Sequence, residues 1–162
     1  ARTREAQGFR HSFDMLGEAA LTAHDAQRYR GAYEDAIDAI GAASRGRGVL
    51  EGPGISIKLS ALHPRYARSQ YGRVMGELLP VLVELCARAK RHDIGLNIDA
   101  EEADRLELSL DLLEHLAFDP ALRGWNGLGF VIQAYQKFWN ERDASRASST
   151  TSWRPRGAVA AA

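Results

Sequence analysis

Apolar and polar residues alternate in three short runs of this chain, and each run ends in polar groups. The runs span residues 54–60, 94–100 and 127–135. Because successive side chains of a strand point to opposite faces, this alternation predicts three strands, each with one apolar and one polar face. Each run therefore brings polar groups to its carboxyl end, where parallel strands of α/β proteins form sites. The polar positions are Ser56, Lys58 and Ser60 in the first run, Asn97 and Asp99 in the second, and Gln133 and Tyr135 in the third.

Segments with apolar residues at helical spacing separate these strands. The spacing predicts helices over residues 22–44, 71–91 and 103–117. Thr22 is a plausible N-cap of the first helix, because Asp25 lies three residues further on, close to the pattern of a capping box. The chain therefore alternates predicted strands with predicted helices.

A further strand is predicted over residues 9–16, where apolar and polar residues again alternate. Four strands separated by three helices imply parallel strands joined by right-handed crossovers. Both an open doubly wound sheet and a (β/α)8 barrel have this order. Polar groups collected on one face favour the barrel, because an open sheet covers both faces with apolar helices. We therefore expect an α/β fold that forms about the first four strands of a partial (β/α)8, TIM-like barrel.

Composition and charge exclude several classes of protein. The formal net charge is zero, which argues against nucleic acid or an acidic membrane as partner. Cys86 is the single cysteine, so it forms no internal disulfide, and its apolar helical stripe predicts a buried thiol. The apolar stretch 78–89 is interrupted by Pro80 and Glu84 and is too short to span a bilayer. We expect a cytoplasmic protein.

The pattern changes after Lys137. Residues 138–162 have neither a strand nor a helix period and are rich in Ser, Thr, Ala and Arg, so we expect a disordered tail. The predicted domains are a partial barrel over residues 1–137 and the tail over residues 138–162. Because periodicity ends abruptly, we interpret the tail as the product of a shifted reading frame.

Four long motifs resemble one known family. They span residues 13–20, 51–66, 97–107 and 129–137 and are similar to the proline dehydrogenase domain of bacterial proline utilization A. Members of that family are bifunctional flavoenzymes that also carry an aldehyde dehydrogenase. The resemblance implies a barrel that binds FAD and oxidises L-proline to Δ1-pyrroline-5-carboxylate, with hydride transfer to flavin N5. Electrons would pass to a membrane quinone, from a parent protein peripheral on the inner membrane.

The same resemblance implies roles for individual residues. Lys58 matches a lysine that helps to hold the substrate carboxylate, and Asp99 matches an active-site aspartate beside flavin and substrate. Glu18 matches a glutamate that pairs with a substrate-binding arginine and gates the pocket. The catalytic residues would thus be Lys58 and Asp99. The flavin-binding positions implied by the family are Ile98, Asp99, Gln133 and Tyr135.

Simpler interpretations of these residues stay open at the level of sequence. Lys58 can be a surface lysine at a strand end, and Asp99 can N-cap the following helix, with Glu102 three residues on. Gln133 and Tyr135 can pack within the barrel. A helix start explains the nearby carboxylates better than a metal site does, and we predict no metal. These carboxylates are Glu101, Glu102 and Asp104.

The resemblance covers about half of the family's barrel. The arginines that grip the proline carboxylate belong to the other half. We therefore predict that this chain alone is inactive, because half a barrel leaves a strand edge and an apolar face uncovered. The alternative is a noncatalytic half-barrel remnant or assembly piece that folds by pairing with another half-barrel. A homo-oligomer also stays open.

Overall fold

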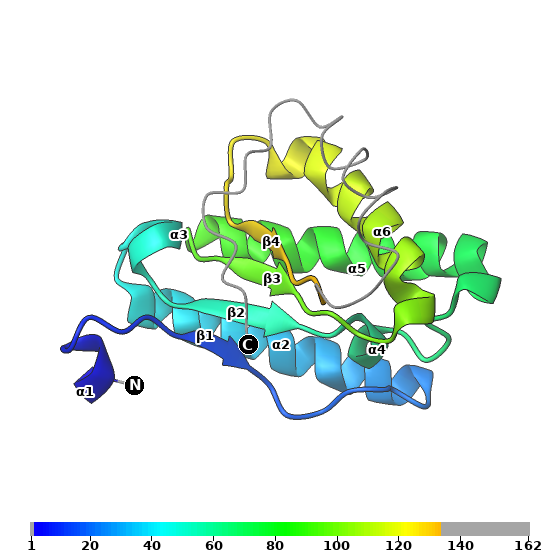
Figure 1. Cartoon of the computed structure of the whole chain (residues 1–162), viewed down its shortest axis with the longest axis horizontal. Helices are drawn as coiled ribbons and strands as arrows, with labels where there is room; N and C mark the ends of the chain where they lie inside the picture. Colours follow the sequence, from blue (N-terminus) through cyan, green and yellow to red (C-terminus); the bar gives the residue numbers. More distant parts are fainter. Residues whose placement is uncertain (1, 134–162) are drawn as a thin grey trace. The chain divides into compact units, whose positions relative to one another are not determined.

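A parallel sheet of four strands organises this protein. The computed structural model describes residues 2–133 of the chain. The chain divides into two units, Ala1–Ile132 and Gln133–Ala162, and the elements below belong to the first. All four arrows point the same way in Figure 1, so the carboxyl ends of the strands meet at one edge. The strands, in sheet order, are β1 (Ser12–Asp14), β2 (Gly54–Ile57), β3 (Leu96–Ile98) and β4 (Leu128–Phe130).

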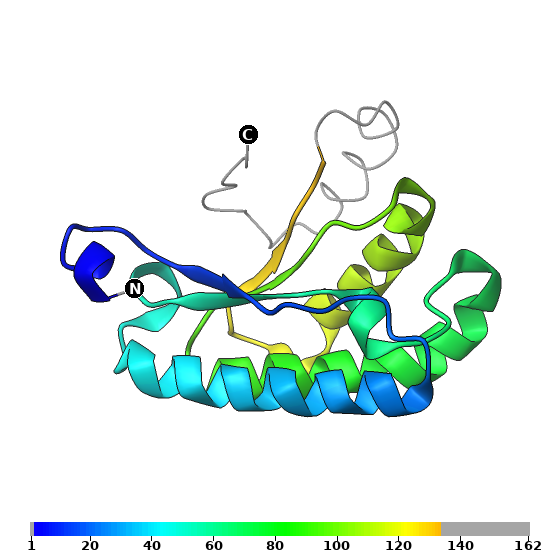
Figure 2. The same cartoon turned by 90° about the horizontal axis from the view of Figure 1, so that it is seen from below.

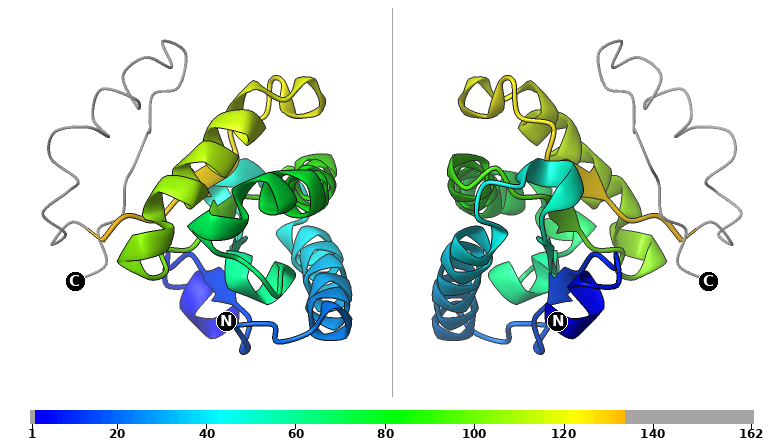
Figure 3. Two further views of the ribbon diagram at one scale, coloured as in Figure 1. Left: turned by 90° about the vertical axis from the view of Figure 1, so that its right-hand side faces the viewer. Right: turned by 90° about the vertical axis from the view of Figure 1, so that its left-hand side faces the viewer.

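Three long helices connect the strands, which confirms the predicted alternation. They are α2 (Ala23–Ser44), α5 (Tyr71–Arg91) and α6 (Leu106–Phe118). Helix α2 packs against α5, and α5 packs against α6. Figure 2 shows α2 and α5 along the same face of the sheet, and Figure 3 shows the three helices following one another around the strands. The shorter elements are α1 (Arg2–Glu5), α3 (Gly48–Glu51), α4 (Leu59–Leu62), η1 (Arg68–Gln70), η2 (Ala103–Arg105) and η3 (Pro120–Leu122).

The core lies between the sheet and these helices. Ile55 and Ile57 of β2 are fully buried there, together with Leu96 and Ile98 of β3. Ser56 and Asn97, which have the opposite phase, are only half-buried. The predicted separation of apolar and polar faces is therefore confirmed for β2 and β3, whereas the three residues of β4 are all half-buried and those of β1 are exposed.

Cys86 occupies the core face of α5, as predicted. Its side chain is fully buried, and burial raises the pKa of the thiol to about 12, with a smaller contribution from Asp119. At neutral pH the sulfur is therefore protonated, and it acts as a small apolar side chain in the core.

The strands are shorter than predicted. β1 takes only three residues of the predicted 9–16 strand. β2 ends at Ile57, and Leu59–Leu62 form one helical turn, so the prediction of Ser60 in a strand was wrong. The physical reason is that the Ser60 N–H binds the carboxylate of Glu101 rather than a neighbouring strand.

The last predicted strand, over residues 128–135, is likewise confirmed only in part. β4 covers Leu128–Phe130, and residues 131–133 follow it without regular structure. Tyr135 and the predicted disordered tail over residues 138–162 lie outside the described residues.

The capping box at the start of α2 is confirmed. Thr22 Oγ1 accepts a hydrogen bond from the Asp25 N–H at 3.1 Å, and Asp25 Oδ2 accepts one from the Thr22 N–H at 3.0 Å. We expect Thr22→Ala to lower the free energy of unfolding by about 1 kcal/mol, because a backbone N–H of the first turn loses its acceptor. Urea denaturation measures this loss. Thr22→Ser keeps the hydroxyl and should stay close to the wild type; an equal loss in both variants would contradict the capping role.

Candidate active site

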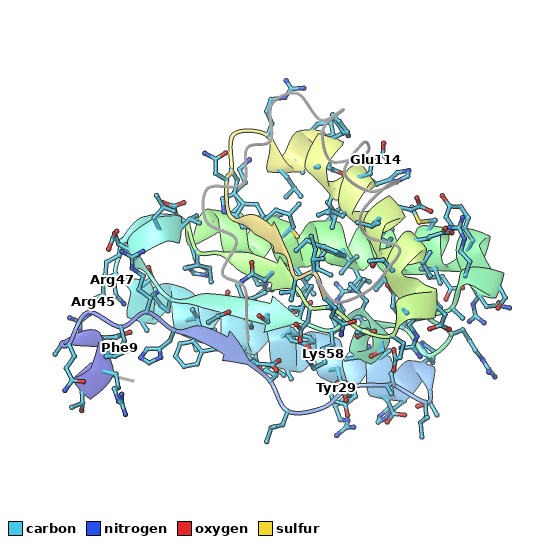
Figure 4. The ribbon with its side chains drawn as sticks, in the orientation of Figure 1. Phe9, Tyr29, Arg45, Arg47, Lys58 and Glu114 are labelled. Atoms are coloured by element: carbon cyan, nitrogen blue, oxygen red, sulfur yellow. The ribbon has the colours of Figure 1, made fainter. Side chains whose placement is uncertain are left out.

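A lysine and three carboxylates meet at the carboxyl edge of the sheet. Lys58 directly follows β2, and its ammonium group is hydrogen-bonded and ion-paired with Asp99, which directly follows β3. Asp14 Oδ2 lies 3.6 Å from Lys58 Nζ, and Glu18 Oε2 lies 3.9 Å from the same nitrogen. Figure 4 labels Lys58 just past the tip of the β2 arrow. Carboxylates from the ends of β1 and β3 therefore surround one cation at the end of β2, which lies between them.

The strand register explains why these side chains meet. Asp14 of β1 pairs with Ser56 of β2, and Ser56 pairs with Asn97 of β3, so the three residues form one row across the sheet. Lys58 and Asp99 each lie two residues further along their chain segments. Since side chains alternate with a period of two, Lys58 and Asp99 return to the same polar face as that row.

The backbone beside the ion pair is held by buried partners. The Lys58 N–H donates to the hydroxyl of Tyr33 at 3.0 Å, and the Asp99 N–H donates to the Ile57 carbonyl at 2.9 Å. Tyr33 is fully buried in α2, and burial is the main cause of its raised pKa. A core tyrosine of α2 thus also fixes the backbone at Lys58.

The Lys58 ammonium is stabilised by its carboxylate neighbours. Burial on its own lowers the pKa of Lys58, but the hydrogen bond and charge of Asp99 outweigh burial, with further contributions from Asp14 and Glu18, so the pKa is raised above its ordinary value. Three carboxylates face this one ammonium group. A substrate carboxylate would therefore have to compete with Asp99 for Lys58, or arrive with a further cation.

The Lys58–Asp99 pair gives the stability of the chain a pH dependence. Because the folded-state pKa of Lys58 is raised, the pair contributes stability that is fully present below the unfolded pKa and is lost as pH rises through the folded pKa. We expect the difference in free energy of unfolding between the wild type and Asp99→Asn to be constant from about pH 7 to 9 and to shrink above about pH 10.5. Urea denaturation across this range measures it, with exposed Asp104→Asn as control. A difference that grows above pH 10.5 would contradict this origin.

Not every predicted site residue lies in this cluster. Lys58, Asp99 and Glu18 are brought together. The N-cap interpretation of Asp99 was wrong, because Glu102 is the residue that precedes η2. The Ile98 side chain is buried in the core, and its carbonyl accepts a hydrogen bond from the Val131 N–H at 2.9 Å.

This geometry does not test the third predicted strand end. Gln133 belongs to the second unit of the chain, and Tyr135 lies outside the described residues. The flavin-binding roles of Ile98, Gln133 and Tyr135 therefore stay predictions.

Sequence reasoning missed three participants. Asp14 was visible as a polar position of the alternating 9–16 segment, but nothing in the sequence gave its distance from Lys58. Glu101 was interpreted as part of a helix start, whereas its largely buried carboxylate accepts a hydrogen bond from Ser60 Oγ at 2.8 Å. No local signal reveals this contact, because its partner lies 41 residues earlier in the chain. The third participant is Tyr33, whose hydroxyl no sequence pattern connects with Lys58.

Residues 2–133 show neither a metal-binding cluster nor a membrane-spanning helix. In that part of the chain, no group of three or more His, Cys, Asp or Glu side chains is arranged to hold a metal ion. None of its helices combines the length and apolar character needed to cross a bilayer.

Sequence comparisons relate this chain to known proteins. Residues 1–148 match the family model described as proline dehydrogenase. The bifunctional protein PutA of Salmonella typhimurium is 72% identical over 137 residues, which cover 85% of this chain and 10% of that protein. PutA of Escherichia coli is 70% identical over 137 residues, with the same coverage. The chain thus spans about a tenth of the length of these curated relatives.

Solved structures give the same likeness. A crystal structure of Bradyrhizobium japonicum proline utilization A aligns with a TM-score of 0.76 and 53% identity, over 87% of this chain and 14% of that chain. Proline utilization A from Bdellovibrio bacteriovorus aligns with a TM-score of 0.77 at 20% identity, over 93% of this chain and 16% of that chain. At that identity, the second likeness concerns the fold alone.

Proposed function

This chain belongs to the proline dehydrogenase family, and from that premise we propose that it supplies one wall of an active site that oxidises L-proline. The proposed reaction converts L-proline to Δ1-pyrroline-5-carboxylate, with FAD as hydride acceptor and a membrane quinone as the next electron acceptor, in a cytoplasmic enzyme. The observation that carries the proposal is the Lys58–Asp99 ion pair, with Asp14 and Glu18 beside it, at the carboxyl edge of parallel strands.

The polar face of β3 and β4 has the chemistry to hold a flavin. Gly129 has no side chain, so the carboxamide of Asn97 lies over it, in the space that a Cβ would fill. An amide and a carboxylate on this face match the C=O and N–H groups of a flavin ring. From the family resemblance, we propose that Ile98, Asp99, Gln133 and Tyr135 are flavin-binding residues. When bound, FAD supplies the acceptor for the hydride from proline C5.

The residues of this wall would bind and orient the substrate. Lys58 stays protonated at neutral pH, because its pKa is raised, and it offers N–H donors to the proline carboxylate. Asp99 holds the ammonium group in place from β3. The side chain of Glu18 is 66% exposed, so it is the carboxylate of the cluster best placed to pair with a substrate-binding arginine.

A chimera tests this function. The chain would replace the 137 matching residues of the Salmonella typhimurium protein, and the unmodified Salmonella protein would serve as control. We expect the purified chimera to show a flavin absorbance spectrum and proline-dependent reduction of a dye. A folded chimera that binds flavin but fails to reduce the dye with proline would contradict the proposed function.

We further propose that the 162-residue polypeptide does not turn over by itself. Among the described residues, β1 and β4 each pair with a single strand, and no arginine pairs with Asp14, Glu18 or Asp99. Clear proline-dependent dye reduction by the purified chain would overturn this. The second candidate, a noncatalytic assembly piece, is favoured by the same open strand edges. A mass that rises with concentration in light scattering would support it.

A further inference from the structure

One largely buried carboxylate connects the segments that follow the first three strands. Glu101 Oε1 accepts hydrogen bonds from the Ser60 N–H at 3.1 Å and from Ser60 Oγ at 2.8 Å. Ser60 Oγ in turn accepts from the Ala19 N–H at 3.2 Å, and the Ser60 carbonyl accepts from the Ala20 N–H at 2.8 Å. Ser60 is thus bonded on one side to the segment after β1 and on the other to the segment after β3.

Each bonded segment carries one charged group of the candidate site. In each segment, the hydrogen-bonded residue lies one or two positions from the charged residue, so fixing the first restricts the position of the second. The Ser60–Glu101 contact therefore limits how far the members of the cluster can separate. The neighbours are Ala19 beside Glu18, Ser60 two residues after Lys58, and Glu101 two residues after Asp99.

Because of burial and backbone conformation, losing these hydrogen bonds would cost the local structure much of its stability. Ser60 is 6% exposed, and the Glu101 side chain is 9% exposed, so water replaces their hydrogen bonds poorly. Bonds to an ionised carboxylate are also stronger than bonds between neutral groups. Ala19 has a φ of 57°, in the left-handed region that costs a non-glycine residue about 1 kcal/mol or more. Its bond to Ser60 offsets that strain and fixes the turn beside Glu18.

We propose that Glu101 is a positioning residue of the active site. Acting through Ser60, it holds Glu18 and Asp99 in place around Lys58. That this site is an active site rests on the proposed function, whereas the positioning itself is a property of this chain. Arg105, which pairs with both Glu101 and Glu102, offers the competing explanation that Glu101 only stabilises the start of η2.

The test uses nuclear magnetic resonance on the full chain, labelled with ¹⁵N throughout. The chain has three lysines, Lys58, Lys90 and Lys137, so the side-chain nitrogen of Lys58 can be followed during a pH titration with Lys90 as reference. In Glu101→Ala, we expect the Ala19 and Ala20 amides to exchange at least about fivefold faster. The pKa of Lys58 should fall, because Asp99 and Glu18 are held less closely. The control Glu102→Ala removes the same charge from an exposed neighbour and should change neither quantity.

Two milder variants keep the test decisive if Glu101→Ala fails to fold. Glu101→Gln retains an acceptor oxygen for Ser60 and should restore the protection of both amides. Ser60→Ala removes Oγ but keeps the carbonyl, so the Ala19 amide should exchange faster and the Ala20 amide should not.

Several outcomes would overturn the proposal. One is unchanged exchange of Ala19 and Ala20 in a folded Glu101→Ala chain. Another is an equal loss of protection at the Ile55 amide, which bonds to Gly95 and reports general loosening of the sheet. An unchanged Lys58 titration is a third. None of these measurements involves proline or flavin, so their failure is distinct from a failure of the chimera.

Discussion

Replacing Lys58 by methionine in the Salmonella chimera is expected to lower kcat/KM for proline by at least about 30-fold, since truncating one partner of a largely buried charge pair typically costs about 2–5 kcal/mol. Methionine has a similar volume but carries no charge. Asp99, Asp14 and Glu18 would then lack the ammonium that now lies among them. Their negative charges would repel one another and any substrate carboxylate. Steady-state dye reduction over a range of proline concentrations measures the change.

Two controls separate a role in the reaction from a role in folding. Lys90→Met makes the same substitution at a lysine that binds the carbonyls of Ala121 and Arg123, away from the candidate site, and should keep kcat/KM close to that of the parent chimera. Lys58→Arg keeps the positive charge and should retain part of the activity. If the folded Lys58→Met chimera kept full kcat/KM, Lys58 would be only a counter-ion for Asp99.

The helices were predictable because their determinants are local. The capping box of Thr22 and Asp25 spans three residues, and the observed helix Ala23–Ser44 starts directly after Thr22. The predicted 71–91 segment is α5 as observed, with Arg88, Lys90 and Arg91 in its last turn. The phases of the strands were predictable for the same reason, since a period of two needs only a few consecutive residues.

The ends of the strands were not predictable, because partners distant in sequence determine them. Alternation continues through Ser60, yet the chain turns at Leu59 when Ser60 meets Glu101 from the segment after β3. In the same way, nothing near Tyr33 indicates that its hydroxyl accepts the Lys58 N–H. Such contacts depend on how helices and strand ends pack in three dimensions. The residues that neighbour them in the sequence do not reveal this packing.

The sequence predicted which strand face carries the candidate site, but only some of the residues that form it. The polar phase of two strand ends correctly brought Lys58 and Asp99 to one face, and the family resemblance added Glu18. Asp14 has the same phase but belongs to a strand whose register with β2 became clear only in the structure. Gln133 and Tyr135 stay predictions, because the geometry of the first unit does not include them.

Leu82→Ala is expected to cause a large loss of stability, about 2–5 kcal/mol, because a fully buried leucine is removed and its cavity closes only partly. Leu82 lies in the core on α5, the helix that packs against both α2 and α6. Leu50→Ala makes the same change at a side chain that is 64% exposed and should cost no more than about 0.5 kcal/mol. Urea denaturation followed by circular dichroism compares the two. Equal losses of stability in the two variants would mean that packing of α5 does not stabilise the sheet from which Lys58 and Asp99 project. The geometry of the site would then not depend on this core.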